Sequence, residues 1–449
     1  MIHRFVQSAA AKDPARPFLV AAEREVPYAE AAEAVARIAG GFLVRGLSRI
    51  GIYMANSPTL VLTLLGAVRA GVEPCVINHE SSRDEVDEIL SRLELSHLVV
   101  DEPLGVRNAE EIPSRELPNV PAASEPPADA GILILTTGTT GVPKAARYVW
   151  SDLAAQVRTR DDQATSRWLL GYNLNHFGGV QMLMHVLVNG ATLVLPSSLR
   201  PSDAISAIES HGVTHVSATP TFWRMVKVQI APERLRALPL RHVTLGAEAA
   251  SKDLLDDLRG WFPDARIVHI FAATEVGSCF SVDDGRDGVP ASILDRGDDA
   301  GVQFEIRDGE LFIRSRHGMT GYYGEAAAAT DGWRSTGDLV EQRGDRIYFV
   351  GRKSERINVG GVKVDPLPVE ERVQRVPEVA LVRVYGKPNA ITGQVVAVDV
   401  MVVPNADRSA VERSIREACR DLPPQARPRL IRFVDQLETR NSKLARRAS

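Results

Sequence analysis

Short apolar runs alternate with amphipathic segments of helical periodicity through the first two thirds of the chain, and this alternation constrains the fold more than any other feature. Typical runs are Arg49–Met54 and His242–Gly246, and typical amphipathic segments are Arg83–Leu93 and Lys252–Phe262. Strand–helix alternation of this kind predicts an α/β fold with mainly parallel sheets covered by helices on both faces. The other expected strands here are Pro74–Asn78, His97–Asp101, Gly131–Thr136, Ala191–Pro196, His215–Ala218 and Ile267–Phe271. The other expected helices are Ser57–Ala70, Gly179–Val188 and Pro201–His211.

The pattern changes after Gly301, where short strands such as Val302–Arg307 predict a small β-rich unit. Beyond a turn-rich boundary at Gly351–Ser354, strands and helices alternate again in a compact α+β module. We therefore expect a large domain, residues 1–351, followed by a small domain, residues 352–449. The stretch Asp101–Ala130 is rich in Pro and Glu and predicts a surface excursion.

Composition excludes several classes of function. The 449 residues carry a net charge of only −4 with both signs interspersed, which gives no indication of nucleic-acid binding. The three cysteines lack metal-ligand spacing, so we expect reduced thiols and a cytoplasmic protein. The most apolar segment, Leu60–Val68, is halted by Arg69 and is too short for a membrane span. It predicts a buried helix.

A run of Thr and Gly follows the expected strand Gly131–Thr136 and ends in Pro143 and Lys144. Glycines let a backbone approach a polyphosphate closely, while hydroxyls, N–H groups and a lysine supply donors and charge. An ordinary polar turn is the alternative interpretation. The order of residues differs from a Walker P-loop, because Lys144 follows Pro143 and no Gly-Lys-Ser/Thr is present.

The whole string Leu133–Lys144 resembles the phosphate loop of the adenylate-forming superfamily, which includes acyl-CoA synthetases, luciferases and peptide-synthetase adenylation domains. Further motifs follow in the family's order: Gly246-Ala247-Glu248, Phe271-Ala272-Ala273-Thr274-Glu275, Thr336-Gly337-Asp338, Gly351-Arg352 and Thr439-Arg440-Asn441-Ser442-Lys443. The resemblance runs from about residue 15 to the end. It implies an adenylation domain over residues 1–351 and a mobile C-terminal lid domain over residues 352–449.

The resemblance also implies how ATP and Mg²⁺ are bound. The Phe271 ring would stack on adenine, Thr274 would contact the α-phosphate, Glu275 would hold Mg²⁺, and Asp338 would accept both ribose hydroxyls. Arg352 would be a second nucleotide contact. The remaining implied nucleotide contacts are Thr136, Thr137, Gly138, Thr139, Thr140, Gly141, Lys144, Gly246, Ala247, Glu248 and Ala272.

Lys443 is the implied catalytic lysine on the small domain, which would swing about a hinge at Ser354. The face containing Gly360 and Gly361 would then line the approach of a pantetheine thiol. The expected catalytic residues are Lys443, Thr274, Glu275 and His176. Three residues depart from the family's usual pattern: Ala272 and Ser442 stand where Gly is usual, and Ser354 replaces a charged hinge residue.

The acid pocket is expected beside His176-Phe177-Gly178-Gly179, which resembles the family's His/aromatic loop. Adenylation domains for α-amino acids carry an Asp one residue after that aromatic to pair with the substrate ammonium. Here the position is Phe177, so amino acids are disfavoured. The candidate walls, Phe177, Gly178, Gly179, Val180, Ala247, Ser278 and Cys279, are small and mostly apolar and favour an aryl or medium-chain acid.

The resemblance thus implies a ligase that converts a small carboxylic acid and ATP to acyl-AMP and pyrophosphate, and then forms a thioester with coenzyme A. An adenylation enzyme that loads the phosphopantetheine of an acyl carrier protein, or an amine, is the alternative within enzymes. A nucleotide-binding protein that has lost catalysis and acts by interaction is the alternative from another class.

Overall fold

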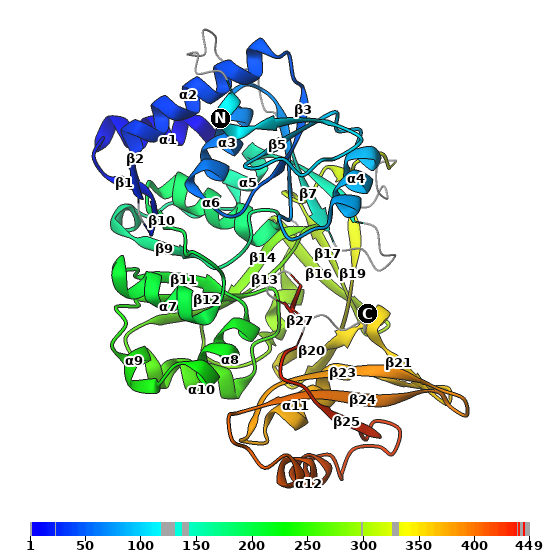
Figure 1. Cartoon of the computed structure of the whole chain (residues 1–449). Coiled ribbons are helices and arrows are strands. Elements are labelled where there is room, and N and C mark those ends of the chain that lie inside the picture. The colour runs from blue at the N-terminus through cyan, green and yellow to red at the C-terminus, as the bar shows by residue number, and fades with distance from the viewer. Residues whose placement is uncertain are drawn as a thin grey trace.

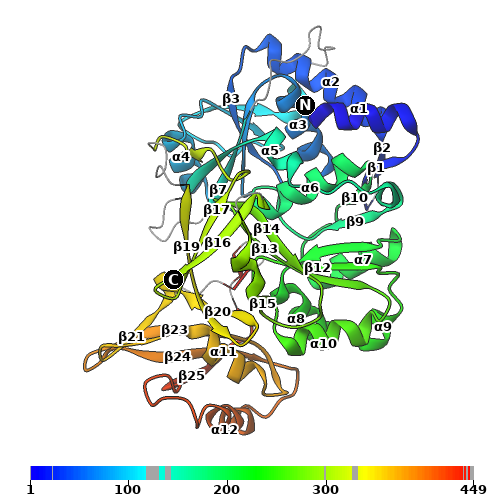
Figure 2. The same cartoon turned by 180° about the vertical axis from the view of Figure 1, so that it is seen from behind.

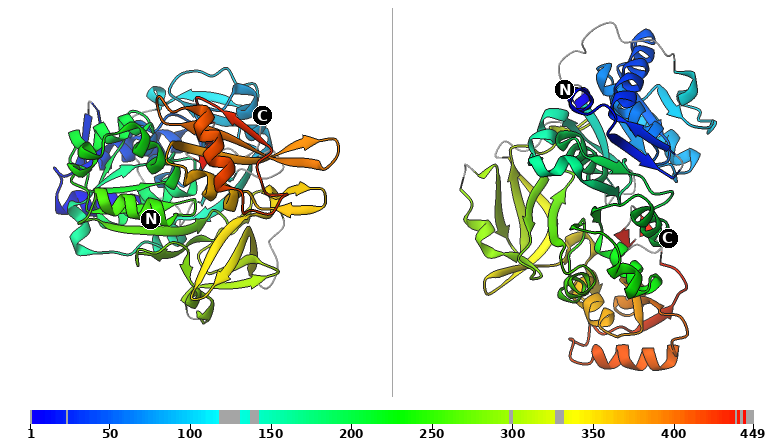
Figure 3. Two further views of the ribbon diagram at one scale, coloured as in Figure 1. Left: turned by 90° about the horizontal axis from the view of Figure 1, so that it is seen from below. Right: turned by 90° about the vertical axis from the view of Figure 1, so that its left-hand side faces the viewer.

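The computed structural model describes residues 2–22, 24–117, 131–136, 143–297, 300–325 and 332–437, except the side chains of 161 and 162. It also describes the backbone of residues 439–440 and 443–444. Two large sheets and a smaller β-rich sheet form the N-terminal part, and a separate sheet with two helices forms the C-terminal unit at the end opposite α1 (Ile2–Lys12) and α2 (Tyr28–Val44) (Figures 1, 2 and 3).

One large sheet has eight strands among the described residues. In spatial order these are β14 (Gly277–Val282), β13 (Arg266–Ala273), β12 (His242–Gly246), β11 (His215–Ala218), β9 (Arg167–Leu170), β10 (Thr192–Val194), β1 (Pro17–Ala21) and β2 (Arg24–Pro27). The strands from β13 to β1 pair in parallel, and only β14 and β2 at the edges are antiparallel. Carboxyl ends of parallel strands meet at one edge, where ligands of α/β proteins usually bind.

The other large sheet has seven strands within the described ranges. They are β18 (Gly321–Tyr322), β8 (Lys144–Val149), β7 (Gly131–Thr136), β4 (Glu73–Ile77), β3 (Arg49–Tyr53), β5 (His97–Val100) and β6 (Glu110–Pro113). The helices of the N-terminal part, besides α1 and α2, are α3 (Pro58–Arg69), α4 (Arg83–Arg92), α5 (Trp150–Ala155), α6 (Phe177–Asn189), α7 (Pro201–Ser210), α8 (Pro220–Gln229), α9 (Pro232–Arg236) and α10 (Lys252–Trp261).

Local sequence explains where several helices begin. Ser57 caps α3 by accepting from the Leu60 N–H at 3.1 Å, with Pro58 at the first helical position. Ser82 and Glu85 form a capping box at the start of α4. The apolar segment predicted to be a buried helix is α3, whose residues from Leu60 to Val68 are all buried. No helix in the described part of the chain is both long and apolar enough to cross a membrane.

The β-rich sheet consists of β15 (Val289–Pro290), β20 (Arg346–Arg352), β19 (Trp333–Arg343), β17 (Glu310–Ser315) and β16 (Val302–Arg307). The C-terminal unit contains β22 (Val362–Val364), β21 (Ile357–Val359), β24 (Gly393–Val402), β23 (Val379–Asn389), β25 (Leu430–Phe433), α11 (Pro366–Gln374) and α12 (Arg408–Ala418). The short pair β26 (Thr439–Arg440) and β27 (Lys443–Leu444) follows. Between β20 and β21 lies one 3₁₀ turn, Lys353–Glu355, which contains the predicted hinge residue Ser354.

The predicted fold class is confirmed, and four predicted strands have the observed bounds: β7, β11, β12 and β16. The expectation for Asp101–Ala130 was wrong in part. Residues Glu110–Pro113 form β6, which pairs in parallel with β5 at the edge of the sheet. An edge strand pairs on one side only and needs little apolar sequence, so its signal was weak. Residues 118–130 lie outside the described part.

A buried ion network joins three strands of the C-terminal unit. Asp399 on β24 is fully buried and accepts from Arg383 on β23 at 2.5 Å and from Arg432 on β25 at 2.8 Å. The Tyr385 hydroxyl donates to the same carboxylate at 3.2 Å. Burial alone would raise the pKa of Asp399, but the bonds from Arg432 and Arg383 outweigh burial and lower it below the usual value.

Because the pKa of Asp399 is lowered in the folded state, the stability it contributes is present above the unfolded-state pKa of about 4 and is lost as pH falls through the folded-state pKa. We expect Asp399→Asn to lower the unfolding free energy of the C-terminal unit by about 3–5 kcal/mol at pH 7, since two arginines lose their buried partner. The loss should shrink towards pH 3. Urea denaturation at both pH values measures it.

The control is Asp435→Asn, which removes an exposed carboxylate paired with Arg408 in the same unit. Its effect should stay within about 0.5 kcal/mol. Equal effects of the two substitutions at pH 7 would contradict the assigned role of Asp399.

Candidate functional site

A cavity of about 2300 Å³ opens between the N-terminal sheets and the C-terminal unit. Its walls include the carboxyl ends of β12 and β13, the start of α6, the middle of β19 and the end of β20. The sequence-predicted residues that line it are Thr136, His176, Phe177, Gly178, Gly246, Ala247, Glu248, Phe271, Ala272, Thr274, Glu275, Ser278, Asp338, Arg352 and Ser354. Motifs separated by up to two hundred residues of sequence therefore meet around one space.

Other predicted site residues lie elsewhere. Lys144, Gly179, Val180, Cys279, Gly360 and Gly361 are described but do not line the cavity. Val180 and Cys279 are buried in the hydrophobic core, where Cys279 Sγ donates to the Gly277 carbonyl at 3.4 Å. The predicted contacts Thr137, Gly138, Thr139, Thr140 and Gly141 fall outside the described residues.

The two ends of the predicted phosphate loop are paired with each other across β7 and β8. Thr136 is the register partner of Lys144 and donates from its hydroxyl to the Lys144 carbonyl at 3.3 Å. The Lys144 ammonium pairs with Glu325 at 2.8 Å and lies 4.9 Å from the centre of the Tyr322 ring. Lys144 is thus held beside the cavity by a neighbouring carboxylate and an aromatic ring.

Tyr322 was missed by sequence reasoning. Its hydroxyl donates to Glu275 Oε1 at 2.7 Å and also makes a hydrogen bond with Thr136. Burial and the Glu275 carboxylate raise the pKa of Tyr322 above its usual value, so the phenol remains a donor at neutral pH. One tyrosine therefore connects the end of the phosphate loop to the carboxylate that the sequence predicts as the metal ligand.

The loop Gly246-Ala247-Glu248 begins at the last residue of β12 and has a strained backbone at Ala247. Ala247 has a φ of +72°, a region that costs energy for a residue with a Cβ and is concentrated at functional sites. Glu248 accepts from the N–H and hydroxyl of Thr221 at 2.9 and 2.8 Å, which anchors the loop to the start of α8. Contacts within the protein therefore hold this loop in place.

The Phe271 ring already has aromatic partners. It stacks on Phe280 at 5.3 Å and on Phe349 at 5.0 Å, with 11° between the ring planes in both pairs, and all three rings line the cavity. Adenine stacking on Phe271 stays a prediction, with these neighbours to accommodate. Ala272 lies at a register irregularity between β13 and β14, where the backbone departs from regular pairing.

Asp338, in the middle of β19, and Arg352, the last residue of β20, are register partners. Arg352 Nε donates to Asp338 Oδ1 at 2.9 Å, and the Thr336 hydroxyl accepts from the Asp338 N–H at 3.1 Å. Asp338 is buried whereas half of the Arg352 side chain is exposed. The pair sits beside Ser354, so it marks the junction between the N-terminal part and the C-terminal unit.

Lys443 lies on β27, which Figures 1 and 2 draw in the space between the N-terminal sheets and the C-terminal unit. Its side chain is outside the described part of the chain. Gly360 and Gly361 form the two-residue turn between β21 and β22 with φ of +60° and +89°. A hairpin turn of this length needs positive φ at both positions, which explains the glycine pair.

Part of the cavity wall is more polar than the sequence predicted. Trp168, Gln181, His185, Ser217, His242 and Thr244 line it besides the predicted walls. A signal for three of them was present, because strands buried on both faces usually read as continuous apolar runs. His215-Val216-Ser217 and His242-Val243-Thr244 instead alternate polar and apolar residues, which marks one polar face.

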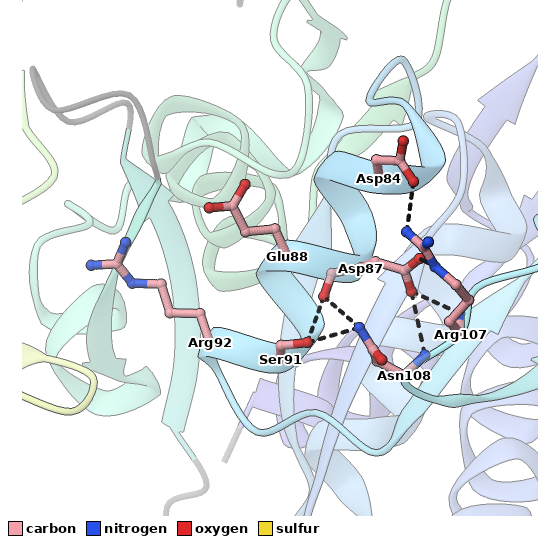
Figure 4. A pocket seen from close by; sticks show the side chains of 7 residues that line it. All are labelled: Asp84, Asp87, Glu88, Ser91, Arg92, Arg107 and Asn108. Atoms are coloured by element: carbon pink, nitrogen blue, oxygen red, sulfur yellow. Dashed lines mark hydrogen bonds and ion pairs between the residues drawn. The ribbon is translucent and has the colours of Figure 1, made fainter.

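A smaller hollow beside α4 is a structural cluster (Figure 4). Asp87 accepts from Arg107 Nε at 2.9 Å and from the Arg107 N–H at 2.8 Å. Asn108 donates to Ser91 at 2.8 Å, and Arg107 Nη2 reaches Asp84 at 2.7 Å. These hydrogen bonds tie the segment after β5 to α4.

Two adjacent glycines at the start of α6 give a matched test of this wall. A Cβ at Gly179 would lie 2.3 Å from the Asn173 carbonyl oxygen, whereas one at Gly178 would only touch the Tyr172 ring at 3.4 Å. We expect Gly179→Ala to lower the unfolding free energy by about 1–3 kcal/mol, because the backbone at Asn173 must move to make room for the methyl group. Gly178→Ala should leave it unchanged or raise it slightly. Urea unfolding measures both, and equal stability would contradict the close approach at Gly179.

The known proteins that this chain resembles include CoA synthases and CoA ligases. The feruloyl-CoA synthase of an Amycolatopsis species is 26% identical over 452 residues, which cover 92% of this chain and 91% of that protein. The indoleacetate–CoA ligase of Aromatoleum aromaticum is 26% identical over 458 residues, covering 91% and 89%. The crystal structure of the anthranilate CoA ligase AuaEII with anthranoyl-AMP has the same fold, with a TM-score of 0.84, 19% identity and coverage of 98% and 95%.

Residues 6–323 match the family of AMP-binding enzymes, and residues 368–443 match the C-terminal domain of AMP-binding enzymes. The family predicted from the sequence is therefore confirmed. By its fold, by the convergence of its motifs on one cavity and by these matches, this chain belongs to the AMP-binding enzymes.

Proposed function

We propose that this protein activates a carboxylic acid with ATP and transfers the acyl group to coenzyme A. The observation that carries the proposal is the meeting of Thr136, Glu248, Glu275, Asp338 and Arg352 around one cavity large enough for a nucleotide and an acid. The names of the relatives, which are CoA synthases and CoA ligases, support the same reaction class.

In the first step a carboxylate oxygen attacks the α-phosphorus of ATP, the bond to the β-phosphate oxygen breaks, and pyrophosphate leaves with the bonding electrons. In the second step the thiolate attacks the acyl carbon, AMP leaves with the electrons of the anhydride bond, and the thiol proton passes to solvent. Negative charge grows on phosphate oxygens in the first step, so preorganised cations and donors matter most there.

Residues present in the cavity fit a magnesium site. No group of three or more His, Cys, Asp or Glu side chains able to hold a metal occurs in the described ranges. Mg²⁺ bound with a nucleotide usually takes one or two carboxylates plus phosphate oxygens and water. Glu275, oriented by the Tyr322 hydroxyl, supplies such a carboxylate. When bound, the ion would neutralise phosphate charge.

The C-terminal unit would contribute the catalytic lysine and the second conformation. Lys443 belongs to β27, which follows this unit in the chain, and Ser354 lies in the turn that joins the two parts. We propose residues 1–351 as the adenylation domain and residues 352–449 as the lid that turns about Ser354. Cys75, Cys279 and Cys419 are free and buried, which fits the proposed cytoplasmic setting.

The proposal predicts acid-dependent exchange of pyrophosphate into ATP, measured over a panel of aryl and aliphatic carboxylic acids. Lys443→Ala should reduce the exchange by at least about 100-fold with an unchanged melting temperature, because a cation that stabilises the transition state is lost. Lys387→Ala, at an exposed lysine of the same unit, is the control and should exchange normally. Exchange by Lys443→Ala at the wild-type rate would remove this lysine from the mechanism.

The acyl acceptor is decided by adding coenzyme A, a phosphopantetheine carrier protein or an amine to the preformed acyl-adenylate. Consumption by coenzyme A alone supports the proposal. Consumption by one of the other acceptors favours the alternative adenylation enzyme. ATP binding without exchange by any acid of the panel favours a protein that has lost catalysis, with Ala272, Ser354 and Ser442 as the altered positions.

Asp338→Asn tests the ribose contact. Loss of the charged acceptor, and of its bond to Arg352, should weaken ATP binding by about tenfold or more, because hydrogen bonds to charged groups contribute about 1.5–3 kcal/mol. Isothermal titration with a non-hydrolysable ATP analogue measures the affinity. Asp345→Asn, at an exposed carboxylate in the turn of the same hairpin, should bind like wild type. An unaltered affinity in Asp338→Asn would exclude the ribose role.

A further inference from the structure

Four aromatic side chains form a floor at the amino-terminal ends of three parallel strands. Trp168, His215 and His242 are direct register partners on β9, β11 and β12, so they lie on one face of the sheet. The ring centre of Trp168 is 4.6 Å from that of His215 and 4.7 Å from that of His185, which comes from α6. His215 stacks on His242 at 5.5 Å. We call Trp168, His185, His215 and His242 the aromatic floor.

The aromatic floor belongs to the cavity of the proposed active site. Trp168, His185 and His242 line that cavity, as do Ser217 and Thr244, which lie two residues further along the same strand face. Gly246 lies four residues after His242 on β12, a distance of about 13 Å along the strand. The distance between the aromatic floor and the predicted nucleotide loop Gly246–Glu248 is thus about the length of an extended aromatic acid.

Three buried polar atoms around this floor have no hydrogen-bond partner within the described residues: Trp168 Nε1, Gln181 Oε1 and His185 Nε2. The indole nitrogen is a donor only and the amide oxygen an acceptor only. Burial lowers the pKa of His185 to about 4, so the imidazole is neutral. A buried polar atom without a partner costs roughly 1–3 kcal/mol, so three beside the aromatic floor indicate polar groups supplied from outside the chain.

An unpartnered indole alone would carry no such argument. Trp150 and Trp223 also bury an indole nitrogen without a hydrogen-bond partner in the described part, and neither lines the cavity. What distinguishes Trp168 is that an amide oxygen and an imidazole nitrogen in the same condition line the same cavity. Gln181 and His185 are also four residues apart on α6, so they face the cavity from one side of the helix.

We propose that the acid accepted by this enzyme is an elongated aromatic acid with a neutral hydrogen-bonding substituent, a hydroxyl above all, at the end remote from the carboxylate. This rests on the proposed function. A hydroxyl can accept from Trp168 Nε1–H while it donates to Gln181 Oε1 or His185 Nε2. The rings of the floor offer edges and faces to an aromatic ring. Trp168, Gln181 and His185 are then specificity-determining residues, and an acid without the substituent would leave their polar atoms unpaired.

The test measures kcat/KM for pyrophosphate release with matched acids: 4-hydroxycinnamate against cinnamate, and 4-hydroxybenzoate against benzoate. The wild-type enzyme should prefer 4-hydroxycinnamate over cinnamate by at least about 100-fold, because a site built to bond a hydroxyl strongly rejects the analogue without it. The shorter pair should show a smaller preference, since its hydroxyl stops above the floor.

Trp168→Phe and Gln181→Leu should each lower the preference for the hydroxylated acid at least tenfold. The value of kcat/KM should fall for the hydroxylated acid and stay unchanged for the unsubstituted acid. Trp223→Phe makes the same chemical change at a buried tryptophan away from the cavity and should keep the preference. If Trp168→Phe does not fold, Gln181→Leu still decides. The selectivity ratio is the readout, because a loss of stability would lower activity with both acids equally.

Pyrophosphate release with no preference, or with a preference for the unsubstituted acids, would overturn this inference and leave the proposed function standing. If Trp168→Phe and Gln181→Leu both keep the wild-type preference for the hydroxylated acid, the inference is also overturned and the proposed function still stands. If no acid of the wider panel releases pyrophosphate, the proposed function fails and the inference fails with it.

Discussion

The fixed register of the parallel strands β11, β12 and β13 is the constraint on which the rest of the site depends. His215, His242 and Arg266 are aligned at one end of these strands, so the segments that leave the other end emerge together. Gly246–Glu248 and Phe271–Glu275 thereby face the same cavity although they are distant in sequence. Backbone hydrogen bonds between buried strands hold this alignment, and a shift of one residue would turn the polar face into the apolar core.

The same register gives the cavity two chemically different ends. At the carboxyl ends of the strands, charged groups gather: Glu275 with Tyr322, and Asp338 with Arg352. At the amino ends, neutral rings and unpartnered polar atoms surround Trp168. A molecule with an anionic head and an aromatic body fits this polarity in one orientation only, because a buried charge without a partner is costly. The proposed acid would therefore bind with its carboxylate towards the nucleotide end of the cavity.

One short turn is the covalent connection between the two parts of the molecule, and α11 and β23 of the C-terminal unit also contact β20 and α8. β20 ends at Arg352, whose partner Asp338 belongs to the β-rich sheet, and one short turn later the chain enters the C-terminal unit. That unit is held together independently, by its own valine-rich core and by the buried carboxylate Asp399 with two arginines. A rigid unit joined through a short turn is the arrangement expected of a domain that moves as a body.

The sequence alone determined the fold class, the family and the motif residues that line the cavity, because each depends on local signals. Strand–helix periodicity sets parallel sheets. The motifs Gly246-Ala247-Glu248 and Phe271–Glu275 lie at the carboxyl ends of β12, whose bounds the apolar pattern predicted, and of β13, which runs two residues beyond its predicted end. Only the tertiary structure decided that Val180 and Cys279 pack in the core, that Lys144 pairs with Glu325, and that Tyr322 reaches Glu275. It alone also brought Trp168, Gln181 and His185 together, since side chains from a strand and a helix meet only when the helix packs on the sheet, a long-range contact that no local pattern encodes.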